Sequence, residues 1–242
     1  MIRRALAIAV VLESTAIASP CPVFNLGPHV VTPPGTVIED GGGVLVGTEI
    51  DPKNHEWKPG DRAEPTNQPT WRFLGAHRVA FTPAIELLAP GLSLYRLPDA
   101  GDTFVLETDT HAKVAAVKRS PDRDTARLPP PMPTQITFAM TEGFRFTQIR
   151  VTATLVGPAP RHAAAMIAYR VVGDRRTAIS WGLVGAATTT IPVFQSRGAC
   201  VPGAPGEEPP RVGDHIVLAW VDESGRVSAS SREVTVVGGK MP

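Results

Sequence analysis

The six histidines of this chain stand apart from one another, and none has the neighbours that a known catalytic or metal motif requires. The sequence has no His-Glu-x-x-His pair, no Cys-x-x-Cys pair and no acidic calcium loop. The nearest set of metal-ligand types lies within one polar stretch and comprises Asp51, Asn54, His55 and Glu56. A solvated loop accounts for this stretch more simply. The sequence therefore predicts neither a metal nor a cofactor.

Motifs for covalent or acid–base catalysis are absent as well. No Gly-x-Ser-x-Gly turn is present. The neighbouring carboxylates Glu39-Asp40 and Glu207-Glu208 stand beside glycine or proline, which is typical of solvated turns rather than of a paired acid and base. His215 opens an apolar stretch and is expected to be a hydrogen-bonded structural residue. We therefore predict a protein that is not an enzyme, with a secreted hydrolase whose site lies between two domains as the alternative.

Tryptophans are the remaining candidates for binding chemistry, because an indole on a loop can stack on a sugar or anchor a protein. Trp57 lies inside the polar stretch 48–70 and Trp71 follows it, so both are candidate partner-binding residues. Packing over the end of a sandwich is the alternative for each. Trp181 and Trp220 lie in apolar segments and are expected in a core. The stretch 48–70 around Trp57 predicts contact with an unknown protein or glycan at the cell envelope.

The N-terminus has the three-part layout of a secretory signal peptide. Arg3 and Arg4 precede a short apolar run, and Ala16-Ile17-Ala18 supplies a cleavage site. The run is too short to span a bilayer, which needs about 20 residues. We predict that residues 1–18 are removed and that the protein is exported, to the periplasm or beyond the cell. Lipidation at Cys21 is the alternative that Pro20 disfavours.

Two cysteines, Cys21 and Cys200, remain in the exported chain. Two cysteines in an exported protein most simply form a disulfide bond. Pairing between chains and a reactive thiol are the alternatives, but the prolines around both residues offer no base to activate a thiolate. The predicted bond would tie the new N-terminus to a loop near the C-terminal end.

The charge composition disfavours two classes of partner, nucleic acids and anionic membranes. The 242 residues carry 24 Lys+Arg against 23 Asp+Glu, so no global field favours nucleic acid or an anionic membrane. No later segment has the length and apolarity of a transmembrane helix. Neither a nucleic-acid partner nor a transmembrane segment is expected.

Alternation of apolar and polar residues at period two, between turns rich in glycine and proline, predicts an all-β protein with few helices. Residues 215–221 are apolar on both faces, which predicts a central strand. The alanines of 163–168 would permit a helix as well as a strand. Strands are expected at 146–155, 163–172, 178–184, 188–194, 215–221 and 227–236, and in the first half at 44–46, 77–82, 85–88, 92–97, 103–108 and 112–118.

A charged, proline-rich stretch at 119–133 is typical of a semi-rigid linker. It separates two segments of the size of a β-sandwich domain. The predicted organisation is a signal peptide at 1–18, an N-terminal antiparallel β-sandwich at 19–118, the linker at 119–133 and a C-terminal antiparallel β-sandwich at 134–242.

One hairpin carries a family resemblance. Residues 218–228, Leu-Ala-Trp-Val-Asp-Glu-Ser-Gly-Arg-Val-Ser, resemble the F strand, turn and G strand of fibronectin type III and bacterial immunoglobulin-like domains. Gly213-Asp214 suits the corner before this F strand, and the resemblance extends over 134–237. Residues 33–36 resemble the opening of exported bacterial immunoglobulin-like domains. The resemblance implies an adhesion, spacing or binding role without a shared active site.

Overall fold

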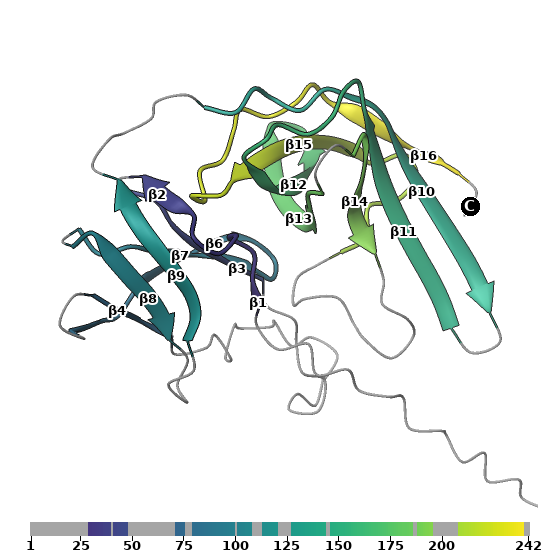
Figure 1. The fold of residues 1–242 in the computed structure, drawn as a ribbon. Coiled ribbons are helices and arrows are strands. Elements are labelled where there is room, and N and C mark those ends of the chain that lie inside the picture. The colour runs from purple at the N-terminus through teal and green to yellow at the C-terminus, as the bar shows by residue number, and fades with distance from the viewer. Residues whose placement is uncertain are drawn as a thin grey trace, which may run out of the picture.

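The computed structural model describes residues 29–39, 41–47, 71–75, 79–99, 101–107, 113–120, 127–143, 146–185, 188–195 and 208–239. Every regular element within these ranges is a β-strand, and the strands gather into three sheets (Figure 1). Across the same ranges no helix has the length and apolarity needed to cross a membrane. The all-β expectation is confirmed.

The first half of the chain forms two sheets. One has the strand order β1-β3-β7-β6 and the other the order β2-β9-β8-β4-β5. All neighbours are antiparallel except β2 and β9, which run parallel. The strands are β1 (His29–Val30), β2 (Val37–Glu39), β3 (Gly43–Gly47), β4 (Arg72–Leu74), β5 (Ala80–Phe81), β6 (Ala84–Ala89), β7 (Leu92–Arg96), β8 (Thr103–Glu107) and β9 (Lys113–Ser120).

These two sheets share an apolar core, as in a sandwich. The four-stranded sheet contributes Val44, Val46 and Tyr95, and each is fully buried. The five-stranded sheet contributes Ile38, Phe73, Phe104, Leu106 and Val117. Phe104 meets Phe73 and Phe81 edge to face, with ring centroids 6.0 and 6.1 Å apart. We call this cluster the first core.

The second half forms one seven-stranded sheet with the order β13-β12-β15-β16-β10-β11-β14. All neighbours are antiparallel except β10 and β16, which run parallel. The strands are β10 (Pro133–Gly143), β11 (Phe146–Leu155), β12 (Ala163–Val172), β13 (Arg175–Leu183), β14 (Thr190–Gln195), β15 (His215–Asp222) and β16 (Val234–Gly238).

This sheet folds back on itself, so that its first and last strands meet. A Cβ built on Gly182 of β13 would lie 1.8 Å from the carbonyl oxygen of Pro192 in β14, a distance that only glycine tolerates. The strands enclose a second core of residues that include Val151, Met166, Leu218 and Trp220. The two ends of the sheet are thus held together by close backbone contact and a shared interior.

A third core joins the halves. Alternate residues of β3 and β7 point away from the first core, and these are Leu45, Leu92 and Leu94. They pack against Ala165, Ile167 and Val221 of the second half, all of which are fully buried. Because successive side chains of a strand face opposite ways, β3 and β7 of the four-stranded sheet are buried on both faces, and all five residues of β3 are buried.

Most strand predictions are confirmed. The strand at 146–155 matches β11, and 163–168 is strand rather than helix because it belongs to β12. The apolar stretch 215–221 is central, as predicted, since β15 lies between β12 and β16. In the first half, residues 44–46, 85–88, 92–97, 103–108 and 112–118 coincide with β3, β6, β7, β8 and β9 to within two residues at each end.

Two expectations in the second half need correction. The predicted strand 227–236 is regular only from Val234 onward; before it, Val227 makes an isolated bridge to Val221. The linker was expected at 119–133, yet β9 extends to Ser120 and β10 begins at Pro133; the strand at 133–143 was not predicted, although Ile136, Phe138 and Met140 recur at period two. The signal peptide at 1–18 lies outside the described residues, and the domain boundary stays a prediction.

Candidate functional site

The turn at 222–226 is built around the side chain of Asp222. Its Oδ1 accepts hydrogen bonds from the backbone N–H of Ser224 at 2.9 Å and of Arg226 at 2.8 Å. The N–H of Gly225 donates to the Asp222 carbonyl at 2.9 Å, and Gly225 has φ +82°, the left-handed region that favours glycine. Asp and Gly at these positions are the residues such a turn requires. The turn is therefore defined locally, before it meets the rest of the protein.

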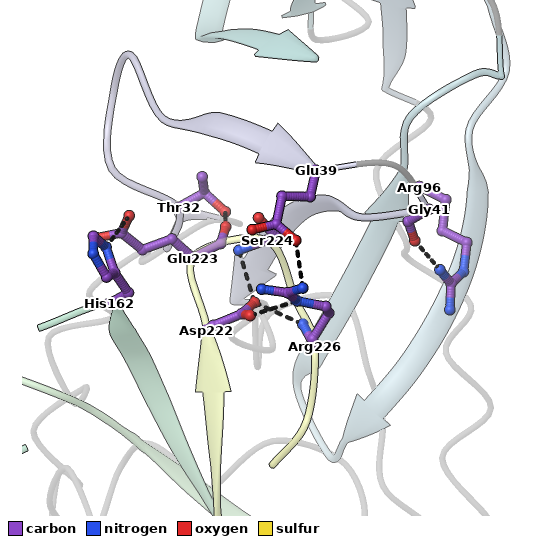
Figure 2. A network of polar contacts seen from close by, with 9 residues as sticks. All are labelled: Thr32, Glu39, Gly41, Arg96, His162, Asp222, Glu223, Ser224 and Arg226. Carbon is purple, nitrogen blue, oxygen red and sulfur yellow. Dashed lines mark hydrogen bonds and ion pairs between the residues drawn. The ribbon is translucent and has the colours of Figure 1, made fainter. Parts of the chain in front are cut away.

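This turn docks on the first half of the chain (Figure 2). The backbone N–H of Gly43 donates to the Ser224 carbonyl at 3.0 Å. The Thr32 hydroxyl donates to the Glu223 carbonyl at 3.2 Å and accepts from the N–H of Leu45 at 2.8 Å. Thr32 is 2% exposed, so its hydroxyl links the two halves away from solvent. We call this contact region the joint.

Small residues let the backbones approach at the joint. A Cβ built on Gly42 would lie 2.9 Å from the Ser224 carbonyl oxygen, and one on Gly225 would lie 2.2 Å from Cδ1 of Leu94. Real Cβ atoms do not approach this closely, so larger side chains would push the turn away from the four-stranded sheet. Two glycines, one on each side, set the distance between the halves.

Arg226 adds an electrostatic link. Its Nε donates to Asp222 Oδ2 at 2.8 Å, and its Nη1 pairs with Glu39 Oε2. Asp222 and Glu39 have side chains only 8% and 16% exposed, and that of Arg226 is 32% exposed. One guanidinium therefore faces two poorly solvated carboxylates from different halves. Such a pair is costly to break from one side, because the remaining charge stays buried.

The rim of the joint is more exposed. Arg96 donates to the Gly41 carbonyl and pairs with Glu86, and both side chains are more than 40% exposed. His162 Nδ1 lies 3.5 Å from Glu223 Oε2, while the Glu223 N–H donates to the His162 carbonyl at 3.0 Å. Exposed pairs of this kind contribute little to stability. These pairs lie around the buried contacts of the joint, so we expect them to shield those contacts from water and to orient the two halves, and to add little to the stability of the joint.

A second polar cluster fixes the corner that precedes β15. Arg170 donates to Asp214 Oδ2 at 3.0 Å and to Glu208 Oε2 at 2.8 Å. Burial alone would lower the pKa of the Arg170 guanidinium, but its bonds to Glu208 and Asp214 outweigh that effect and raise the pKa. Asp214 also accepts from the backbone N–H of Arg211 at 2.8 Å. The cluster keeps its charges paired and orients a turn.

The polar groups of the joint are used in contacts between the two halves of the chain. Its carboxylates accept from backbone N–H groups and from Arg226, and its backbone groups bond across the two halves. Among the residues that the structure describes, no group of three or more His, Cys, Asp and Glu side chains could hold a metal ion. What the arrangement can do chemically is hold the two halves in one relative orientation.

The structure reaches only part of the predicted site. Cys21, Cys200 and Trp57 lie outside the described residues, as does the whole stretch 48–70 with its set of metal-ligand types. Trp71 is described and is 6% exposed, with its ring centroid 6.0 Å from that of Tyr95 in the first core. Its indole is thus packed inside the first half, while its role in partner binding stays a prediction.

Three other predicted structural residues, Trp181, His215 and Trp220, lie within the described ranges. Trp220 is 2% exposed and belongs to the second core, as predicted. Trp181 is half-buried; it packs against the third core and stacks on His29 with ring centroids 6.2 Å apart. His215 has a side chain 55% exposed, and its Nδ1 lies 2.6 Å from Glu233 Oε1. The hydrogen-bonded structural role expected for His215 agrees with this contact.

Sequence reasoning missed the joint. Glu39 was expected in a solvated turn, and this is wrong, because the 222–226 turn covers it and Arg226 pairs with it. The turn itself could be recognised from Asp222 and Gly225. The surface on which it docks could not, since Thr32, Glu39 and Gly42 are distant in sequence and carry no pattern that points to residue 226.

Comparisons with known proteins add no identification. No protein-family model matches the chain, and no curated protein matches it.

Proposed function

We propose that the protein is an exported, non-enzymatic pair of immunoglobulin-like domains that serves as a rigid structural or binding module at the cell envelope. The observation that carries the proposal is the order of strands in the three sheets. Each order corresponds to a known immunoglobulin-type arrangement when the strands are lettered along the chain. The step from this fold to a binding or spacing role is one of analogy, and intact mass and partner capture test it.

The first half supports an immunoglobulin-like domain. Immunoglobulin sandwiches pack a sheet of strands A, B, E and D on a sheet that contains C, F and G. With β1, β3, β7 and β6 as A, B, E and D, the four-stranded order β1-β3-β7-β6 is A-B-E-D. The five-stranded order β2-β9-β8-β4-β5 then corresponds to A′-G-F-C-C′, with β2 and β9 parallel.

Trp71 supports the same correspondence. Immunoglobulin domains characteristically bury a tryptophan on strand C within the core. Trp71 directly precedes β4, the strand that corresponds to C, and packs on Tyr95 of β7. A structural role in the first core is thus the reading that this contact supports for Trp71.

The second half supports a related sandwich. Lettering β10 to β16 as A, B, C, C′, E, F and G gives the order C′-C-F-G-A-B-E. Strand β10 pairs with β11 on one side and, in parallel, with β16 on the other, so one strand links both sheets of a sandwich. The hairpin from which the fibronectin-like resemblance arose corresponds here to β15, its turn and the chain toward β16.

Partner binding through the stretch 48–70 gains support from its place in this scheme. The stretch connects β3 to β4, which corresponds to the connection between strands B and C. In immunoglobulin variable domains that connection is one of the recognition loops. A partner, whether an envelope protein or a glycan, would then contact Trp57, and the joint would hold the two halves in one relative orientation.

Export and the predicted disulfide are tested by the intact mass of protein recovered from the exported fraction. We expect a chain that begins at Ser19, with both thiols resistant to alkylation until a reductant is added. A retained N-terminus or two freely alkylated thiols would contradict export and the link between Cys21 and Cys200 together.

Partner binding is tested by Trp57→Ala in a pull-down from the envelope fraction and on an array of glycans. We expect capture to fall at least about tenfold, the loss of one anchor worth ~1.4 kcal/mol or more, with an unchanged melting temperature. Lys58→Ala, next to it in the same stretch, is the matched control and should retain capture. Equal capture by the wild-type protein and Trp57→Ala would reject the role of this stretch.

A further inference from the structure

We draw no further inference here: the strongest candidate, the apolar face at the distal end of the β10–β11 hairpin where the exposed Met140 pairs across the ladder with the partly buried Ile149, carries nothing because no feature of the structure shows what covers it.

Discussion

Arg226 is the residue on which the charge balance of the joint depends. It is the cation that both Glu39 and Asp222 contact, and those carboxylates come from different halves of the chain. We predict that Arg226→Ala lowers the free energy of unfolding by about 2–3 kcal/mol. Breaking a fully buried pair from one side costs about 3–5 kcal/mol, and the partial exposure of this guanidinium reduces that cost. Urea unfolding of the two proteins measures it.

Arg96→Ala is the matched control for this prediction. Arg96 also pairs with a carboxylate near the joint, but its own side chain and that of Glu86 are both more than 40% exposed, so its loss should cost no more than about 1 kcal/mol. Adding Glu39→Gln to Arg226→Ala should restore part of the lost stability, because it removes a poorly solvated charge that has lost its contact with Arg226. Equal losses for the two arginine variants would mean that Arg226 behaves as an ordinary surface residue.

Tyr169 gives the protein a pH dependence on the alkaline side. Burial raises the pKa of the Tyr169 phenol, so the folded state prefers the neutral form. In the unfolded chain the phenol ionises near pH 10. Stability from this residue is therefore fully present below pH 10 and is lost as the pH rises above it.

Tyr169→Phe checks this prediction, since it keeps the ring and removes the ionisable group. Urea midpoints measured from pH 8 to pH 11 should fall more steeply above pH 10 in the wild-type protein than in the variant. Parallel curves would show that the phenol does not contribute.

At the scale of elements, two serines take the place of a regular strand beside β15. Ser231 Oγ accepts from the N–H of Leu218 and Ser228 Oγ from the N–H of Trp220, each at 2.9 Å. Their own N–H groups donate back to the carbonyls of the same two residues. The segment at 227–233 therefore forms hydrogen bonds with the backbone N–H and C=O groups of Leu218 and Trp220 in β15, although it is not a regular strand. Serine hydroxyls replace part of the backbone ladder here, so the predicted strand 227–236 is regular only at its end.

Ser231→Ala should cost about 1–3 kcal/mol, because the buried N–H of Leu218 loses its acceptor. Ser230→Ala is the control: the Ser230 hydroxyl accepts from Arg176 in an exposed contact at 3.3 Å, and its loss should stay within about 0.5 kcal/mol. Thermal or urea unfolding of the two variants gives the comparison. A cost for Ser231→Ala as small as that of the control would mean that water replaces the hydroxyl.

Most elements with clear periodicity were predicted, but β10 was missed although Ile136, Phe138 and Met140 recur at period two, and the pairing partners of the strands were not predictable. Both β11 and β15 follow from the alternation or continuity of apolar residues over eight or more positions. By contrast, β1, β2 and β4 are two or three residues long, too short for a period to emerge. At the joint, the recognisable turn at 222–226 packs on a surface formed by Thr32, Glu39 and Gly42. These three residues come together with the turn only in the folded structure.

At the scale of the whole molecule, the three apolar cores follow one another, with sheets between them. The first core lies between the two sheets of the first half, the third core covers the opposite face of the four-stranded sheet, and the second core lies beyond β12 and β15. The four-stranded sheet cannot lose its contact with the second half without exposing Leu45, Leu92 and Leu94 to solvent. Exposure of that much apolar surface would be strongly unfavourable, so we expect the two halves to unfold as one cooperative unit.

Leu106→Ala tests this cooperativity, because Leu106 is fully buried in the first core and belongs to β8 of the five-stranded sheet in the first half. The change should cost about 2–5 kcal/mol. If the halves unfold together, amide hydrogen exchange in β14 should accelerate by the same free energy as exchange in β8, since both open through the same global event. Leu87→Ala, whose side chain is 58% exposed on β6, is the control and should alter neither strand. Faster exchange confined to β8 would show instead that the halves are independent domains that merely touch at the joint.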